Sequence, residues 1–280
     1  MAADFFQSEA GKSGGNGGFT ITFLGTGTSV GVPVIGCDCR VCRSDDPRDK
    51  RTRSSILVRA GELTVLVDSG TDLRAQALRE NLREIDAVIY THAHLDHVAG
   101  FDELRAFCWR RTEPLPMYAT ASCLATLQTM FGWAFAPENV HKGYIKPGPV
   151  VIDGPFRIGE LKITPLPVEH GGSVETIGFR FEYPGAKTVA YIPDVKSIPG
   201  GTLALLKNIE VLIIDALRPQ PHPTHFSVSD ALDTAKTSGA GEAWLTHLGH
   251  DNEHAELEES LPGNVHVAWD GLKLSLAGLA

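Results

Sequence analysis

The sequence predicts an α/β protein in which short apolar strands alternate with helices and loops. Two observations carry this prediction. Apolar runs such as Ala87–Tyr90 and Val211–Asp215 are typical of buried strands, whereas Leu73–Leu82 and Ser229–Ser238 have helical spacing. In addition, several of the predicted strands are followed at once by a histidine or an aspartate. Strand ends and the loops after them are where α/β scaffolds place their chemistry.

The other elements follow from periodicity and turn signals. Ser55–Arg59 and Leu63–Val67 are typical of a hairpin. Helices are expected at Asp102–Trp109 and Ser122–Phe131. Further strands are expected at Leu161–Pro165, Thr176–Glu182, Thr188–Ile192, Ala243–Thr246 and Val265–Trp269.

The chain divides into a short tail and one domain. Residues 1–18 end in closely spaced glycines and carry few bulky side chains, so we expect a flexible N-terminal tail. Order is expected to begin with the strand Phe19–Leu24. Because no linker divides the remainder, residues 19–280 are predicted to form a single domain.

Composition and charge narrow the class of protein. Of the 280 residues, 42% are hydrophobic and 21% charged, which excludes a disordered or fibrous protein. No apolar run approaches the ~18 residues that a membrane helix needs, so no membrane partner is expected. The net charge of −9 argues against duplex nucleic acid as a partner, because neutralising phosphates needs a basic face. Cysteine usage and the lack of a signal-peptide pattern predict a cytoplasmic protein.

The strongest chemical signal is a run of ligand-type side chains directly after a buried strand. It contains His92, His94, Asp96 and His97. Imidazole nitrogens and carboxylate oxygens are the ligands that borderline divalent metals prefer. Four such side chains on one tight loop can converge on two neighbouring ions. A polar loop with chance histidines is the alternative, but histidine is a rare residue.

Three single residues at the ends of later predicted strands complete this set. They are His170, Asp194 and His247. Alone, each is more often a cap or a turn residue. Together they make a two-metal site possible, with Asp194 bridging both ions through its two oxygens. The expected ligands of the first ion are His92, His94 and His170, and those of the second are Asp96, His97 and His247.

This ordered set resembles the metallo-β-lactamase superfamily, whose motif is His-x-His-x-Asp-His followed by a later His, Asp and His. The resemblance covers nearly the whole chain from Phe19 onward. It implies an αββα sandwich, with two mixed β-sheets face to face, helices outside, and the metals at one edge.

A second cluster consists of three cysteines within six residues, Cys37, Cys39 and Cys42. The spacing is too short for a disulfide set, but it suits a thiolate metal site, which needs four tetrahedral ligands. His250 is the candidate for the fourth ligand. The alternative is three free thiols on a mobile loop, although a loop of this length needs something to hold it in place.

Three features narrow the resemblance to one branch of the superfamily. They are the cysteine cluster, the segment GTGTSVGVP at residues 25–33 and the pair His247/His250. They resemble the PhnP-type phosphoribosyl cyclic phosphodiesterases of the superfamily. That resemblance implies two divalent ions, manganese or zinc, at the active site, and suggests a homodimer. It also implies one structural zinc held by Cys37, Cys39, Cys42 and His250.

A site of this kind activates a hydroxide for attack on the phosphorus of a small phosphodiester. Asp96 is expected to orient that hydroxide as well as to bind metal. His225, just before a predicted helix, is the candidate for protonating the leaving oxygen and for contacting the substrate. His222 is a further candidate substrate contact, although its proline neighbours also fit a rigid loop. Asp68, at a strand end, is a candidate partner that orients a ligand histidine.

The sequence thus predicts a metal-dependent phosphodiesterase acting on small cyclic phosphodiesters, such as phosphoribosyl cyclic phosphate or cyclic nucleotides. One alternative is a tRNA 3′-processing endonuclease with the same catalytic residues; the negative charge and the lack of a basic arm disfavour it. The other is a non-catalytic nucleotide-binding or metal-binding member of the fold. It is disfavoured because every ligand position is filled.

Overall fold

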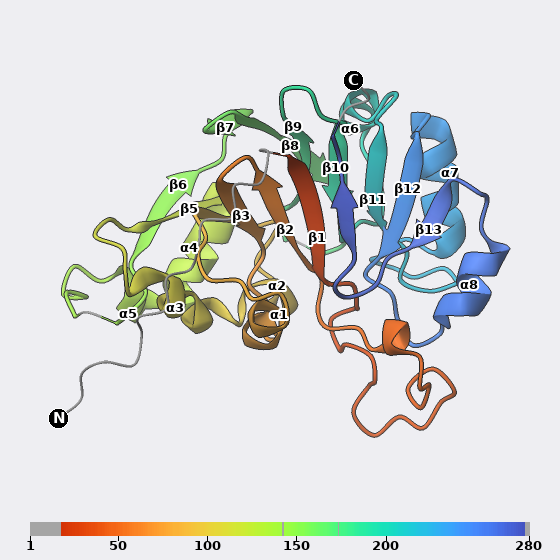
Figure 1. Ribbon diagram of the computed structural model, residues 1–280, viewed down its shortest axis with the longest axis horizontal. Helices are drawn as coiled ribbons and strands as arrows, with labels where there is room; N and C mark the ends of the chain where they lie inside the picture. The colour runs from red at the N-terminus through yellow and green to blue at the C-terminus, as the bar shows by residue number, and fades with distance from the viewer. Residues whose placement is uncertain (1–17, 142, 173, 278–280) are drawn as a thin grey trace.

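Two seven-stranded sheets packed face to face, with helices on both outer faces, make up the molecule (Figure 1). The computed structural model describes residues 18–277 apart from residues 142 and 173. This arrangement is the αββα sandwich with two mixed sheets that the family resemblance implies. The expected N-terminal tail lies, except for Gly18, outside the described residues.

The first sheet is built from the N-terminal half of the chain and one C-terminal strand. Its strands are β1 (Phe19–Gly25), β2 (Ser55–Ala60), β3 (Leu63–Val67), β4 (Ala87–Ile89), β5 (Leu115–Ala119), β6 (Pro147–Val151) and β14 (Lys273–Ser275). Their order is β14-β1-β2-β3-β4-β5-β6. Pairing is antiparallel from β14 to β3 and parallel from β3 to β6.

The second sheet follows the same plan in the C-terminal half. Its strands are β7 (Phe156–Ile158), β8 (Leu161–Val168), β9 (Thr176–Glu182), β10 (Val189–Ile192), β11 (Val211–Asp215), β12 (Glu242–Thr246) and β13 (Val265–Val267). Their order is β13-β12-β11-β10-β9-β8-β7. Pairing is antiparallel from β7 to β10 and parallel from β10 to β13.

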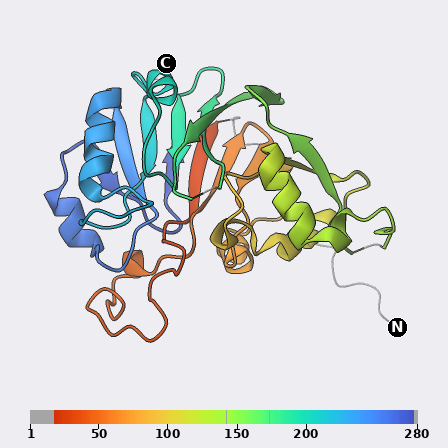
Figure 2. The same ribbon diagram turned by 180° about the vertical axis from the view of Figure 1, so that it is seen from behind.

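Helices cover the outer face of each sheet, as the view in Figure 2 shows for α4 and α7. Those on the side of the first sheet are α1 (Leu73–Arg79), α2 (Leu95–Val98), α3 (Arg105–Cys108), α4 (Ala121–Met130) and α5 (Gly132–Phe135). Those on the side of the second are α6 (Gly200–Leu205), α7 (Val228–Ser238) and α8 (His254–Ser260). The single helix expected at Asp102–Trp109 is instead a 3-10 turn, η2 (Phe101–Leu104), followed by α3.

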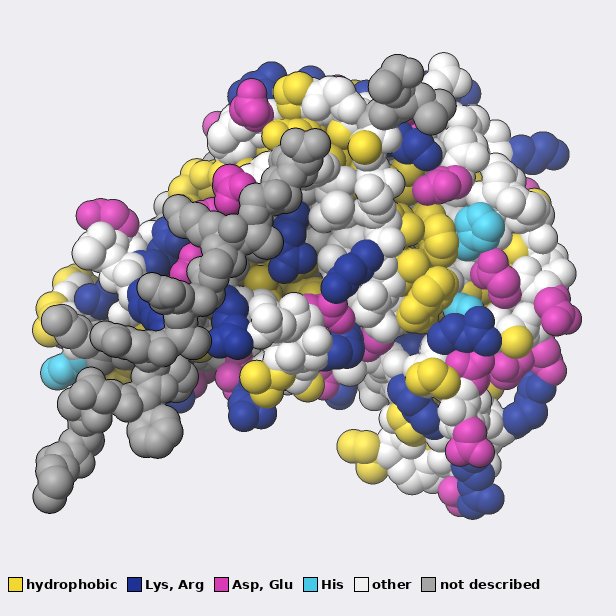
Figure 3. All heavy atoms as spheres, viewed as in Figure 1, with side chains coloured by type: hydrophobic (Ala, Val, Ile, Leu, Met, Phe, Trp, Pro, Cys, Tyr) yellow, Lys and Arg dark blue, Asp and Glu magenta, His cyan; other side chains and the backbone are white. Residues whose placement is uncertain are grey.

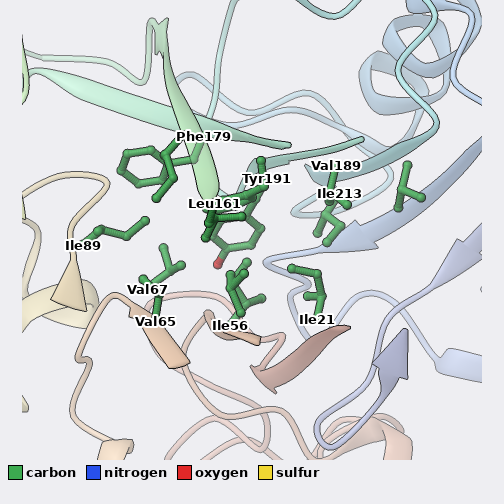
Figure 4. Packing of buried hydrophobic residues seen from close by; sticks show 14 of the residues in the cluster. Ile21, Ile56, Val65, Val67, Ile89, Leu161, Phe179, Val189, Tyr191 and Ile213 are labelled. Carbon is green, nitrogen blue, oxygen red and sulfur yellow. The ribbon is translucent and has the colours of Figure 1, made fainter. Parts of the chain in front are cut away.

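The core explains why the central strands are apolar throughout. Successive side chains of a strand point to opposite faces. In β11, Val211 and Ile213 therefore lie between the sheets, while Leu212 packs under the outer helices. Figure 4 shows the inner layer, where side chains such as Val65 of the first sheet face Tyr191 of the second. Strands buried on both faces need apolar residues at every position.

The strand directions bring the polar strand ends to one edge. β8, β10 and β12 run parallel to one another through the second sheet, and their carboxyl ends lead into His170, Asp194 and His247. In the first sheet, β3 leads into Asp68, and β4 leads into the segment that starts at His92. Among the described residues, no helix has the length and apolar character needed to cross a bilayer.

Candidate metal centre

The metal ligands that the sequence predicts gather at this edge in two groups, and two of them, His170 and Asp194, also form a third set with His225. Within each group, one ligand atom per residue lies within 4.8 Å of those of the others. We call these the histidine group, which is His92, His94 and His170, and the mixed group, which is Asp96, His97, Asp194 and His247. Asp96 and His97 lie on the short helix α2, whereas the sequence predicts a loop at these residues.

The three rings of the histidine group approach one another through their nitrogens. Nδ1 of His94 lies 2.9 Å from Nε2 of His92 and 3.3 Å from Nε2 of His170. Burial lowers the pKa of His92 and that of His170, so both rings are neutral at pH 7. Neutral imidazole is the form that binds a metal ion.

Hydrogen bonds behind two of these rings leave their inward nitrogens unprotonated. His170 donates from Nδ1 to the Thr224 carbonyl at 2.9 Å, and a carbonyl can only accept. Thr91 donates its hydroxyl proton to Asp68 at 2.9 Å, so it accepts from Nδ1 of His92 at 3.0 Å. Each ring therefore directs a lone pair on Nε2 into the group, which is how metal-ligating histidines are held.

In the mixed group, buried polar atoms face one another without a hydrogen bond between them. Nε2 of His97 lies 3.1 Å from Asp194 Oδ2 and 3.3 Å from Asp96 Oδ2. Nε2 of His97, Nε2 of His247 and Oδ2 of Asp194 are all buried without a hydrogen-bond partner among the described residues. Unpaired buried polar atoms are costly. A cation bound between them would satisfy all three, so this donor set fits a divalent metal ion.

Asp68 and Ser54 hold the two histidine rings of the mixed group from behind. Asp68 Oδ2 accepts from Nδ1 of His97 at 2.8 Å. Ser54 donates to the Gly27 carbonyl at 3.0 Å and accepts from Nδ1 of His247 at 3.2 Å. Burial alone would lower the pKa of His97, but the surrounding carboxylates raise it well above its usual value. The group thus carries an excess of negative charge that a cation would balance.

Asp194 lies between the two groups. Its Oδ1 is 3.6 Å from Nε2 of His170 and 3.5 Å from Nε2 of His247, while its Oδ2 faces His97. One carboxylate therefore reaches nitrogens of both groups. The bridging role expected from the sequence stays a prediction, and this is the placement that it needs.

Two residues at the site have a backbone conformation that side chains rarely adopt. Asp68 has a φ of 64° and His247 a φ of 57°. This left-handed region costs a residue other than glycine about 1–3 kcal/mol and persists only where the surroundings enforce it. Both residues follow a strand directly and turn their side chains into the site, so the fold places them there at a cost in free energy.

His225 stands beside both groups, paired with a residue to which the sequence analysis gave no role. Its Nδ1 donates to Asp215 Oδ2 at 2.8 Å. Its ring centroid lies 4.5 Å from that of His170 and 4.8 Å from that of His247. Burial alone would lower the pKa of His225, but the hydrogen bond and charge of Asp215 raise it. The sequence signal that could have identified Asp215 is its position at the end of an apolar strand.

His222 lies at the margin of the site. Among the described residues it belongs to none of the candidate ligand groups. Its ring centroid is 5.3 Å from that of His225, and its Nδ1 is 3.2 Å from the Thr224 hydroxyl. Burial, the neighbouring His225 and the cations Arg218 and Lys196 lower the pKa of His222. The ring is partly exposed and close enough to His225 to contact the same ligand.

The structure also brings the cysteine cluster together with His250. Nδ1 of His250 lies 3.3 Å from Sγ of Cys37, 3.6 Å from that of Cys39 and 3.5 Å from that of Cys42. None of the three cysteines is in a disulfide. A hydrogen bond from the Cys42 backbone lowers the pKa of Cys39 to about 7. Three thiols and one imidazole form a donor set found in structural zinc sites.

Comparison with protein families assigns most of this fold to one domain type. The model described as "Beta-lactamase superfamily domain" matches residues 64–248. The matched segment contains every residue of the histidine and mixed groups together with His222 and His225.

Comparison with individual proteins gives three informative relatives. A solved diphosphatase of the PhnP family superposes with a TM-score of 0.85 at 37% identity, covering 93% of this chain and 98% of that one. Ribonuclease Z of Mycolicibacterium gilvum is 30% identical over 253 residues, 81% of this chain and 83% of the relative. Octanoyltransferase of Porphyromonas gingivalis is 38% identical over 256 residues, 89% of this chain but 50% of the relative. The chain thus spans about half the length of that protein.

Proposed function

Because the chain belongs to the metallo-β-lactamase superfamily of hydrolases, in its PhnP-type branch, we propose that it hydrolyses small phosphodiesters. The observation that carries this proposal is the pairing of the two ligand groups with the buried pair His225–Asp215. The groups supply places for two cations, and the pair supplies a proton donor next to them. Displacement at phosphorus needs both.

The residues proposed to hold the ions are those of the histidine group and the mixed group, with Asp194 shared between them. When bound, two divalent ions neutralise the charge of the phosphate and lower the pKa of water from ~15.7 towards ~7. Manganese and zinc both suit nitrogen and carboxylate ligands. The cysteine cluster is proposed to hold one further zinc with a structural role.

His225 is proposed to hold and deliver the proton that the leaving oxygen needs. Because its Nδ1 is bound to Asp215, the proton for the substrate sits on Nε2. The buried carboxylate stabilises the charged ring and fixes its orientation. Asp96, which belongs to the mixed group, is proposed to orient the attacking water and to bind metal.

Positive charge near His222 supports a small anionic substrate. Lys196 follows Asp194 by two residues, and Arg218 follows Asp215 by three, so both lie near the strand ends that form the site. The chain as a whole carries a net charge of −9. The face in Figure 3 mixes Lys and Arg with Asp and Glu side chains. This face therefore lacks the continuous basic surface that duplex nucleic acid needs.

A small diphosphate is the second candidate substrate class. The observation that favours it is the 37% identity to a diphosphatase of the PhnP family. Cleaving a diphosphate and cleaving a phosphodiester are both displacements at phosphorus, and both need the same charge stabilisation.

A substrate panel tests the proposal. Protein reconstituted with manganese or zinc is assayed with bis-p-nitrophenyl phosphate, a 2′,3′-cyclic nucleotide, a nucleoside diphosphate and a precursor tRNA. We expect turnover of a small phosphodiester that EDTA abolishes. Turnover of the diphosphate alone would favour the second candidate, and cleavage of the tRNA alone would favour the endonuclease. Bound metal with no hydrolysis of any substrate would favour the non-catalytic alternative.

A further inference from the structure

A four-residue segment carries candidate ligands of two different sites, the mixed group and the cysteine cluster. His247 belongs to the mixed group and His250 to the cysteine cluster, and only two residues separate them. In Figure 1 this segment follows β12, and the orange loop with the cysteines lies next to it, below the sheets. Any shift of the segment would therefore move the imidazole of His247, whose backbone is already in the left-handed region.

Backbone hydrogen bonds fix the two residues between these histidines from several directions. Leu248 donates to the Thr26 carbonyl at 2.9 Å and accepts from the Thr28 amide at 3.2 Å. Gly249 donates to the Leu217 carbonyl at 2.8 Å. The Gly249 carbonyl accepts a long hydrogen bond, 3.4 Å, from the Asn252 amide and a shorter one from a side chain.

That side chain is Arg51, which is buried completely. Its Nη1 donates to the Gly249 carbonyl at 3.2 Å, and its Nη2 lies 3.1 Å from Asp49 Oδ1. Both charged side chains have 0% exposure. The same Asp49 oxygen accepts from the backbone amide of His254 at 2.9 Å. Arg51 thus connects the loop before β2 to Gly249 directly and to His254 through Asp49.

We propose that Arg51 is a positioning residue that holds His247 in its left-handed conformation. Only Leu248 lies between His247 and the peptide that Arg51 binds, so the segment has little freedom to relax by itself. A buried ion pair is by itself weak support for stability, because desolvation offsets the attraction. In this protein, the Arg51–Asp49 pair is proposed to fix the orientation of the ligand His247. The inference rests on the proposed function, in which His247 holds a metal ion.

Two substitutions of Arg51 and one control separate positioning from general stability. Arg51→Lys keeps a charge beside Asp49, but one ammonium group cannot reproduce the planar fork that reaches Asp49 and Gly249 together. Arg51→Met removes both contacts. The control is Leu127→Ala, which shortens a fully buried side chain of α4 on the outer face of the first sheet. This cavity lowers stability without touching the segment 247–250.

The measurement is the affinity for Co²⁺ at the histidine and carboxylate ligands, in protein whose cysteine cluster retains zinc, together with the unfolding temperature. We expect Arg51→Met to weaken this affinity by about 10- to 100-fold and Arg51→Lys to weaken it less. Leu127→Ala should lower the unfolding temperature and keep the wild-type affinity. If Arg51→Met does not fold, Arg51→Lys decides.

Wild-type affinity in both Arg51 variants would overturn the inference. The inference would also be overturned if Leu127→Ala and the Arg51 variants had equal unfolding temperatures and lost the same affinity for Co²⁺, because the loss would then follow from lower stability alone. If the wild-type protein itself binds no ion at these ligands, the proposed function fails, and the inference fails with it.

Discussion

Nδ1 of His225 donates a 2.8 Å hydrogen bond to Oδ2 of Asp215, and both side chains are buried beside the two ligand groups. A histidine in this arrangement can hold a proton that is directed away from its carboxylate partner. The same pairing of an imidazole with a buried acid recurs at His97 and Asp68. The first pair is proposed to deliver a proton and the second to orient a ligand, and each role makes a separate prediction.

Replacing His225 by alanine should reduce turnover by about 100-fold or more, because the leaving oxygen loses its proton donor. Metal content should stay at the wild-type level, since the two ligand groups are intact. Steady-state rates and elemental analysis of the same sample check both statements. His266→Ala is the matched control, because the ring of His266 is hydrogen-bonded to Glu258 and not to a residue of the ligand groups. Equal rates in the two variants would remove His225 from the mechanism.

Replacing Asp215 by asparagine should shift the pH profile. The Asp215 carboxylate raises the pKa of His225, so its loss lowers that pKa. The protonated ring then survives only to a lower pH, and the alkaline limb of the rate profile moves to lower pH. At neutral pH the rate should fall by about tenfold or more. Asp233→Asn, an exposed carboxylate on α7, should leave the profile unchanged. An alkaline limb that does not move in Asp215→Asn would contradict the pairing.

Replacing Asp68 by asparagine should weaken metal binding by about 10- to 100-fold. Asp68 accepts hydrogen bonds from the Thr91 amide, the Thr91 hydroxyl and Nδ1 of His97, and asparagine has one acceptor oxygen and no charge with which to replace them. Metal titration by calorimetry measures the effect. Asp86 offers a matched control at the opposite end of β3 and β4, where its carboxylate accepts from the Thr64 amide at 2.7 Å. Asp86→Asn should bind metal as the wild type does. Affinities that fall equally in both variants would indicate a general loss of structure.

Replacing Cys37 by serine should remove about one zinc ion per chain, since a structural site needs all four ligands. The unfolding temperature should fall, because the long cysteine loop is then no longer held to His250 through a metal ion. Elemental analysis and thermal unfolding provide the readouts. Cys108→Ala, at a buried cysteine on α3 outside the cluster, should keep the zinc. Unchanged zinc content in Cys37→Ser would show that the cluster does not hold a metal.

The ligand groups could be predicted from sequence because their chemistry is local and their placement follows from topology. His92, His94, Asp96 and His97 lie within six residues, so no tertiary information is needed to bring them together. Carboxyl ends of parallel strands share one edge of a sheet, which is why His170, Asp194 and His247 meet. The two-sheet sandwich came from the family resemblance, and periodicity alone would not have produced it.

Other features depend on contacts that the sequence does not show. The edge strand β6 reads PGPVV, and neither its prolines nor its glycine suggest a strand; its parallel pairing with β5 makes it one. Asp215 closes an apolar strand, and its role appears only when His225 is seen to turn back onto it. Arg51 sits in a polar loop, and only the fold reveals that it is fully buried against Asp49 and Gly249.

The most direct test of a two-metal phosphodiesterase site follows turnover as metal is added back. Protein with zinc in the cysteine cluster and no other metal is titrated with Mn²⁺ or Zn²⁺, and hydrolysis of the small phosphodiester is measured at each step. We expect no turnover at the start and full turnover once about two ions per chain have been bound. Saturation of the histidine and mixed groups with metal, with no hydrolysis of any small phosphodiester or diphosphate, would contradict it.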